Sequence, residues 1–297
     1  MNTERFGYVV RHLLRRPTSI AGIVLLLAFI LIAIFAPVLA PPENGKDPYS
    51  IPHTGYRPEP SAPSAEHPFG TTERQYDVFY GVVWGTRTAF RVGLIITGAA
   101  LAIGLVVGSL AAYYGGWVDN LLMRLVEIVQ AFPFLLATLT LAAVLRGRMG
   151  SGLTAGIAAL IAFGWPAYSR LIRGDILSVR ARDFNLAARA VGAKDGRILT
   201  RHILPNAIFP TLVYASMDIG SYVLSFAALS FLGLGADVGY ADWGQMISFA
   251  RNWIPSLATY PHIVLYPGMA ILLFVLAWNL LGDAFRDIID PRLRGSR

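Results

Sequence analysis

Long apolar runs alternate with shorter charged segments along the chain. Six runs approach or exceed the roughly 20 residues that a helix needs to cross a bilayer. Their ranges are Ser19–Ala40, Val92–Tyr114, Ile128–Leu145, Leu153–Leu171, Ala207–Leu234 and Ile263–Leu281. The third and fourth runs contain Pro133 and Pro166, and membrane helices tolerate proline. The pattern predicts an all-α membrane protein with six transmembrane helices.

The composition supports this interpretation. Apolar residues make up 55% of the 297 residues and charged residues only 14%, whereas ordinary globular chains carry about 25% charged residues. The composition therefore argues against a soluble enzyme, a disordered protein and a nucleic-acid binder. The chain has no cysteine, and its five histidines show no metal-binding spacing. We therefore expect no disulfide, no metal site and no cofactor.

The first apolar run has two interpretations. Arg11, Arg15 and Arg16 precede it, a pattern that is also found in secretory signal peptides. The run is longer than the apolar region of a typical signal peptide, and Pro41–Pro42 makes a poor cleavage context. We therefore interpret Ser19–Ala40 as an uncleaved anchor helix.

The distribution of basic residues orients the six helices. With the N-terminus inside, 17 of the 25 lysines and arginines fall in cytoplasmic segments and 8 in external ones. Both termini are therefore expected in the cytoplasm. The predicted division is an N-terminal segment with anchor helix (1–40), an extracytoplasmic loop (41–91), a five-helix core (92–283) and a cytoplasmic tail (284–297). The proline-rich external loop has too little apolar content for a core of its own.

The sequence lacks two common motifs for nucleotide binding and nucleophilic catalysis. It contains no GxxxxGK(S/T) phosphate loop and no GxSxG nucleophile elbow. Gly104 and Gly108 in the second run have the GxxxG spacing that permits close packing of membrane helices, as do Gly152 and Gly156 at the fourth. In a glycine-rich chain this spacing also arises by chance.

Asp218 is the acidic residue of most interest within the membrane. It lies about 11 residues into the fifth run, near the middle of the bilayer at 1.5 Å per residue, and an intramembrane acid marks a functional site by default. The alternative is a structural carboxylate that faces the bundle interior and hydrogen-bonds to Ser216, Ser221 or Tyr222. We favour the structural role, because no second acid is available for a proton relay.

The cytoplasmic loop Arg173–Asn206 is the most charged stretch of the chain. Small and apolar residues recur in it with helical periodicity, and Gly192–Ala193 then break the helix. Asp195 is predicted to cap a second short helix, Gly196–Leu204, which Pro205 and Asn206 end. A helix lying on anionic lipid is the alternative, but an alanine-rich face inserts weakly into lipid. We interpret the loop as a docking element for a protein partner.

This loop resembles the EAA loop of permease subunits of ABC importers, which docks into a groove on the cytoplasmic ATPase. The two alanines of the motif fall on Ala187 and Ala188, its glycine on Gly192 and its closing Leu-Pro on Leu204 and Pro205. Leu186 stands where the family has its glutamate, so a salt bridge from that position is not expected. The docking residues that this resemblance implies are Asp183, Phe184, Leu186, Ala187, Ala188, Gly192, Ala193, Arg197, His202, Leu204 and Pro205.

Three further stretches are similar to the C-type permeases of dipeptide, oligopeptide and nickel importers. They are His67–Gly93, Gly115–Pro133 and Pro267–Arg294. In the first of them Thr72 replaces an acid of the family signature, and Gln75–Tyr76 replace its Gly-Arg pair. The resemblance covers almost the whole chain in the same order.

The resemblance implies the all-α type I importer transmembrane domain, also called MetI-like, in a bacterial inner membrane. It implies a heterodimer with a homologous B-type permease, two cytoplasmic ATPase subunits that bind and hydrolyse ATP, and an external substrate-binding protein. The chain itself would then not be an enzyme. The external loop and Ala236–His262, which holds Trp243, Trp253 and Pro255, would be candidate contacts for the binding protein. A membrane-interface role is favoured for Trp253 and left open for Trp243.

The expected function is import of di- or oligopeptides by alternating access, with the cytoplasmic loop as the lever. Nickel or another small solute is the alternative cargo for the same architecture. A stand-alone carrier or channel is the competing class and would work without an ATPase, although we see no inverted repeat of the kind that secondary transporters carry. A membrane-embedded enzyme would need paired acids, histidines or a nucleophile at matching depth, and the sequence shows none.

Overall fold

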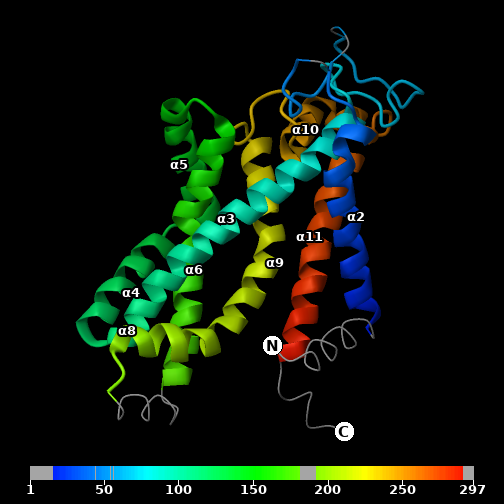
Figure 1. Cartoon of the computed structure of the whole chain (residues 1–297). Helices are drawn as coiled ribbons and strands as arrows, with labels where there is room; N and C mark the ends of the chain where they lie inside the picture. The colour runs from blue at the N-terminus through cyan, green and yellow to red at the C-terminus, as the bar shows by residue number, and fades with distance from the viewer. Residues whose placement is uncertain (1–15, 44, 54, 56, 181–191, 290–297) are drawn as a thin grey trace.

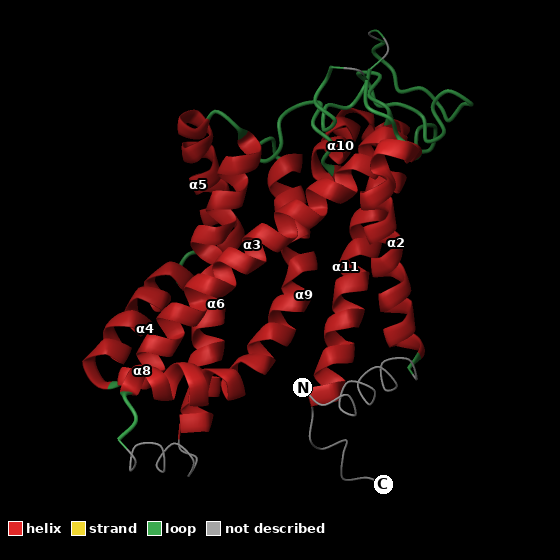
Figure 2. Cartoon of the chain, in the orientation of Figure 1, coloured by secondary structure: helices red, strands yellow, loops and turns green. Residues whose placement is uncertain are grey.

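The computed structural model describes residues 16–43, 45–53, 55, 57–180 and 192–289. Within these ranges every regular element is helical, and the only β pairings are isolated bridges (Figure 2). The five long helices are α2 (Pro17–Leu39), α3 (Val78–Tyr114), α6 (Gly152–Arg180), α9 (Leu204–Phe231) and α11 (His262–Ile289). Each is long and apolar enough to cross a membrane. The predicted all-α membrane fold is confirmed.

The third predicted span is broken. It consists of α4 (Gly116–Gln130) and α5 (Phe134–Met149), which are bent by 83° relative to each other. Pro133 occupies the N-cap position of α5. A proline has no N–H to donate and disfavours helical geometry in the residue before it, so the chain leaves the helix here. The prediction of one continuous helix over Ile128–Leu145 is therefore wrong, and the sixth span exists only if the bent pair counts as one.

The second span begins earlier than predicted. Helix α3 starts at Val78, and the Asp77 carboxylate accepts a 2.7 Å hydrogen bond from the backbone N–H of Tyr80. This N-cap starts the helix within the segment that was assigned to the external loop up to Arg91. The loop therefore ends at Asp77.

The helical stretch that begins at Asp195 is continuous. The short helix α8 (Asp195–Arg197), the π-helix η1 (Ile198–Ile203) and α9 follow one another without a break. The predicted stop at Pro205 is wrong, because the wider π-helical turn before it accommodates a residue without an N–H. The predicted cap is also wrong: Lys194 is the N-cap residue, and the Asp195 carboxylate accepts a hydrogen bond from the Tyr113 hydroxyl.

The two ends of the described chain lie at the same end of the molecule. Helices α2 and α11 run side by side (Figure 1). An ion pair joins Arg16, which precedes α2, to Asp287 near the end of α11. The ion pair therefore holds the beginning of α2 next to the end of α11.

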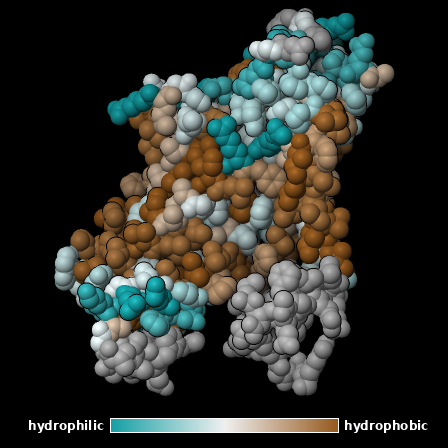
Figure 3. All heavy atoms as spheres, in the orientation of Figure 1, coloured by the Kyte–Doolittle hydropathy of each residue, from teal (hydrophilic) through white to brown (hydrophobic). Residues whose placement is uncertain are grey.

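A hydrophobic belt separates two hydrophilic ends of the molecule (Figure 3). At one end lies a cap, defined as residues 40–77 together with 232–261, which contains α10 (Trp243–Phe249) and η2 (Ala250–Ser256). Cap residues share a buried core with α3 and α11, to which Ile51 and Trp243 each contribute while only 2% exposed. The cap is therefore packed onto the helices and shares their core.

The two tryptophans of the cap have different surroundings. The Trp243 indole N–H donates to the Val82 carbonyl over 3.1 Å, inside the core. The Trp253 indole N–H donates to the Glu73 carboxylate over 3.0 Å and ties η2 to the loop before α3. Trp243 is therefore a core residue, and half-buried Trp253 makes a contact within the chain.

Candidate functional site

The segment 192–207 packs against the ends of α3 and α6. Ile198 and Ile203 are fully buried in a cluster with residues of these two helices. The Arg180 guanidinium at the end of α6 donates to the Ala112 carbonyl over 3.0 Å and lies 5.8 Å from the ring of Tyr113. This segment is therefore in direct contact with α3 and α6 and continues into α9.

The predicted docking residues fall into three groups. Gly192 has φ +76°, a left-handed conformation that favours glycine, and it precedes α8. Arg197 and Pro205 are exposed, whereas Ala193, His202 and Leu204 are half-buried. The remaining predicted residues lie outside the described part of the chain, namely Asp183, Phe184, Leu186, Ala187 and Ala188.

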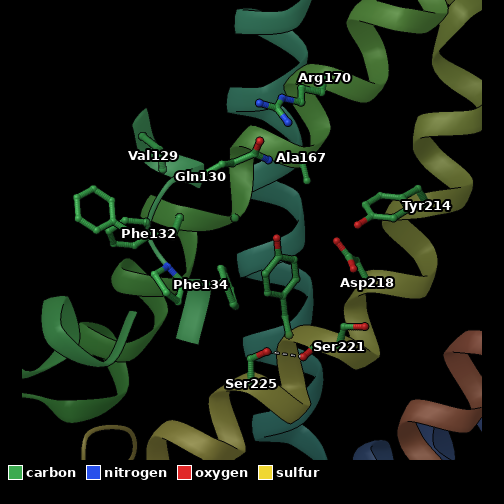
Figure 4. Close-up of a pocket in the computed structure, with 14 residues that line it drawn as sticks. Val129, Gln130, Phe132, Phe134, Ala167, Arg170, Tyr214, Asp218, Ser221 and Ser225 are labelled. Carbon is green, nitrogen blue, oxygen red and sulfur yellow. Dashed lines mark hydrogen bonds between the residues drawn. The ribbon is translucent and has the colours of Figure 1, made fainter. Parts of the chain in front are cut away.

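A cavity of about 710 Å³ lies at mid-height between the bend of α4 and α5 on one side and α6 and α9 on the other (Figure 4). Its lining combines aromatic rings, hydroxyls, one amide and two opposite charges. The lining residues are Val129, Gln130, Phe132, Pro133, Phe134, Phe163, Gly164, Ala167, Arg170, Tyr214, Asp218, Ser221, Tyr222 and Ser225. The break at Pro133 thus forms one wall of the cavity.

Asp218 lies at this cavity. Its Oδ2 atom accepts a 2.8 Å hydrogen bond from the Tyr168 hydroxyl, and Figure 4 shows the carboxylate pointing into the cavity beside Tyr214. The prediction of an inward-facing, hydrogen-bonded carboxylate is correct, but its partner is Tyr168 and not one of the three residues expected. Ser216 instead donates to the Val213 carbonyl.

Gly104 and Gly108 bring α3 against α6. A Cβ atom on Gly104 would lie 2.9 Å from the Trp165 carbonyl, and one on Gly108 would lie 2.5 Å from Ile172 Cγ2. Real side chains do not fit at such distances. The GxxxG spacing is therefore a packing motif, and it fixes the part of α6 that carries Tyr168.

A signal for the cavity is also present in the sequence, beyond Asp218 itself. Polar residues recur along α9 at intervals of three or four, which places them on one face of a helix. These residues are Tyr214, Asp218, Ser221, Tyr222 and Ser225. A polar stripe on an otherwise apolar helix indicates a lined cavity rather than a lipid-facing surface.

Two family models match the chain. The model for "Binding-protein-dependent transport system inner membrane component" matches residues 104–295. The model for the N-terminal transmembrane domain of oligopeptide transport permease C matches residues 5–56. The two matches include the cavity-lining residues and the loop after α6, but not residues 57–103, where most of α3 lies.

Curated relatives match over nearly the full length. A dipeptide transport system permease protein, DppC, of Alkalihalophilus pseudofirmus is 38% identical over 96% of this chain and 89% of its own length. A glutathione transport system permease protein, GsiD, of Pectobacterium atrosepticum is 37% identical over 96% of this chain and 90% of its own. The resemblance to C-type permeases is confirmed.

Solved structures share the fold. A transmembrane chain of the inward-facing MetNI methionine ABC transporter aligns with a TM-score of 0.56 at 21% identity, covering 71% of this chain and 97% of that one. An amino acid ABC transporter aligns with a TM-score of 0.51 at 18% identity, covering 70% and 93%. The fold is thus the type I importer transmembrane domain, and the chain belongs to the family of binding-protein-dependent transport system inner membrane components.

Proposed function

We propose that this chain is the C-type permease subunit of an ATP-driven importer of di- or oligopeptides in a bacterial inner membrane. The observation that carries the proposal is the full-length similarity to dipeptide and glutathione permeases. The cavity supports it, because it combines a carboxylate and a guanidinium with aromatic and hydroxyl groups. Such a lining suits a solute with separate positive and negative ends.

The proposed partners are a homologous B-type permease, two cytoplasmic ATPases and an external substrate-binding protein. ATP binding and hydrolysis belong to the ATPases. We place both termini and the loop after α6 in the cytoplasm, on the basis of the excess of basic residues there. The cap is then extracytoplasmic and is the surface available to the binding protein.

The route from the ATPase to the cavity follows one helix. Residues Asp195–Phe231 are a continuous helical stretch that begins beside the docking loop and carries Asp218. Burial of Ile198 and Ile203 fixes its first turns to α3 and α6. Closure of the ATPases would therefore tilt α9 and α6 together and change the access of the cavity from one side to the other.

The test is to purify the tagged chain with its neighbours in mild detergent and to assay ATPase activity and dialanine import in proteoliposomes. Ala188→Glu places a bulky acid in the alanine pair. It should reduce the amount of ATPase that co-purifies with the chain and stop import. Ala258→Glu is the matched control, since Ala258 is exposed in the cap at the opposite end. A chain that purifies alone and carries solute without ATP would overturn the proposal.

A further inference from the structure

Arg170 and Asp218 are two opposite charges that line one cavity. Arg170 is on α6 and Asp218 is on α9, and in Figure 4 they lie apart on different parts of the cavity wall. Neither forms an ion pair with any other residue in the described ranges. Charged side chains at membrane depth are costly and are kept where they meet a solute, water or each other.

Asp218 is surrounded by groups that suit a cation. One carboxylate oxygen accepts from the Tyr168 hydroxyl, which fixes the orientation of the carboxylate. Tyr214 and Tyr222 line the same cavity. A carboxylate beside aromatic rings is the usual surrounding for an ammonium group, which gains both ionic and cation–π attraction.

A metal ion is a poor fit to the same place. The described residues contain no cluster of three or more histidines, aspartates or glutamates. Hard cations need several oxygen ligands and soft ones need imidazole or thiolate. A single carboxylate among hydroxyls is better matched to a protonated amine.

Arg170 supplies a positive charge in the cavity that complements the Asp218 carboxylate. Its guanidinium is exposed on the cavity wall beside Gln130 (Figure 4). Guanidinium groups bind carboxylates through two parallel hydrogen bonds. The volume of about 710 Å³ is in the range of small-molecule sites and leaves room for a short peptide between the two charges.

We propose that, within the importer function above, Asp218 binds the protonated amino terminus of a peptide in the cavity and Arg170 binds its carboxylate. The permease chain then contributes to selection itself and favours solutes that carry both charges. Tyr168 is a positioning residue, because it holds the Asp218 carboxylate and is packed in turn against Gly104.

The first experiment measures the charge preference of the cavity without relying on transport. The chain has no cysteine, so Ser225→Cys gives a single reporter in the cavity wall. The purified complex is treated with the cationic 2-(trimethylammonium)ethyl methanethiosulfonate and the anionic 2-sulfonatoethyl methanethiosulfonate, and labelling of this chain is followed by intact mass. The two rates are compared with and without ATP and vanadate.

We expect Asp218→Asn to lower the ratio of cationic to anionic labelling by about tenfold, because a carboxylate at short range attracts the cationic reagent. Arg170→Gln should raise the ratio. Asp283→Asn is the matched control, since Asp283 is exposed and does not line the cavity, and it should leave the ratio unchanged. A ratio that Asp218→Asn does not change, or a reporter that labels in neither state, overturns the inference.

The second experiment connects the site to peptides. Import of dialanine at limiting concentration should fall at least tenfold in Asp218→Asn, with a smaller loss at saturation. Dialanine should also protect the Ser225→Cys reporter, and N-acetyl-dialanine should not. A wild-type complex that imports neither dialanine nor longer peptides contradicts the proposed function, whereas peptide import that Asp218→Asn leaves unchanged contradicts this inference alone.

Discussion

Arg173 holds Asp119 through two hydrogen bonds of 2.6 Å each, one from Nε and one from a terminal guanidinium nitrogen. The pair joins α6 to the first turn of α4, at the opposite end of α4 from the bend at Pro133. Both side chains are partly shielded from solvent. The ion pair therefore fixes the base of the helix pair that forms one wall of the cavity.

Breaking this pair should loosen α4. We expect Asp119→Ala and Arg173→Ala each to lower the free energy of unfolding. The coupling free energy between the two residues should be about 1–2 kcal/mol, because a bidentate charge-assisted pair stabilises more than an ordinary surface ion pair does. A double-mutant cycle on the purified complex, followed by denaturant titration, measures the coupling. Arg124 and Glu127 form a more exposed pair on the same helix, and their cycle should give a value near zero. Equal couplings for both pairs would contradict the special role of Arg173.

The glycines of α3 provide a second test. Gly104 and Gly108 leave no room for a side chain against α6, whereas a Cβ atom on Gly98 would meet nothing within 4 Å. We expect Gly108→Leu to separate the two helices and to lower the thermal midpoint strongly, since it forces the Ser169 backbone to move. Gly98→Ala on the same helix should be neutral or slightly stabilising. Thermal unfolding of the two variants in nanodiscs makes the comparison, and a tolerated Gly108→Leu would show that the packing is not tight.

The spans were predictable because each is a long run of apolar side chains, and the bilayer requires that length. The residues at which the helices begin and end were not predictable from this pattern. At the start of α3 the Asp77 carboxylate accepts a hydrogen bond from the Tyr80 backbone N–H. The apolar residues that follow are separated from the main apolar run by Arg87 and Arg91. The continuity of the helix through Pro205 depends on a π-helical turn, for which local sequence gives no signal.

The candidate site was only partly predictable for a related reason. Asp218 stands out because charge within an apolar run is rare. Its partner Tyr168 comes from another helix, 50 residues earlier in the chain, and no local pattern identifies such a contact. The polar stripe on α9 can also be found in the sequence, since helical periodicity alone places it on one face.

The cap offers a prediction about its two tryptophans. Trp243 packs against Phe29 and Phe274, with ring centroids 6.1 and 5.7 Å away, and is 2% exposed. We expect Trp243→Ala to cost about 3–5 kcal/mol, because it leaves a large cavity where α2, α10 and α11 meet. Trp253→Ala removes the hydrogen bond to Glu73 from a half-buried position and should cost about 1 kcal/mol. Denaturant titration distinguishes the two, and a larger loss for Trp253→Ala would contradict the assignment of the core.

A carboxylate buried in the cap should make stability depend on pH. Asp242 is the N-cap of α10, and its Oδ1 accepts a 2.8 Å hydrogen bond from the Gln245 backbone N–H. Burial raises the pKa of Asp242 from 3.8 to about 6, although hydrogen bonds from Gln245 and Ser230 partly oppose this rise. Between about pH 4 and 6 the folded chain thus binds more protons at this residue than the unfolded chain. The contribution of Asp242 to stability therefore falls as the pH rises through this range and is lowest above it.

Asp242→Asn should remove this dependence. Asparagine is as good an N-cap as aspartate and carries no charge to desolvate, so the variant should be more stable than the wild type at pH 7.5, by roughly 1–3 kcal/mol. At pH 4.5 the difference should shrink, because the wild-type carboxyl is then mostly protonated. Asp242→Ala loses the cap as well and should be less stable than Asp242→Asn at both pH values, by about 1 kcal/mol. Thermal midpoints of the three proteins in nanodiscs at the two pH values test this, and an advantage of Asp242→Asn that grows toward low pH would contradict the raised pKa.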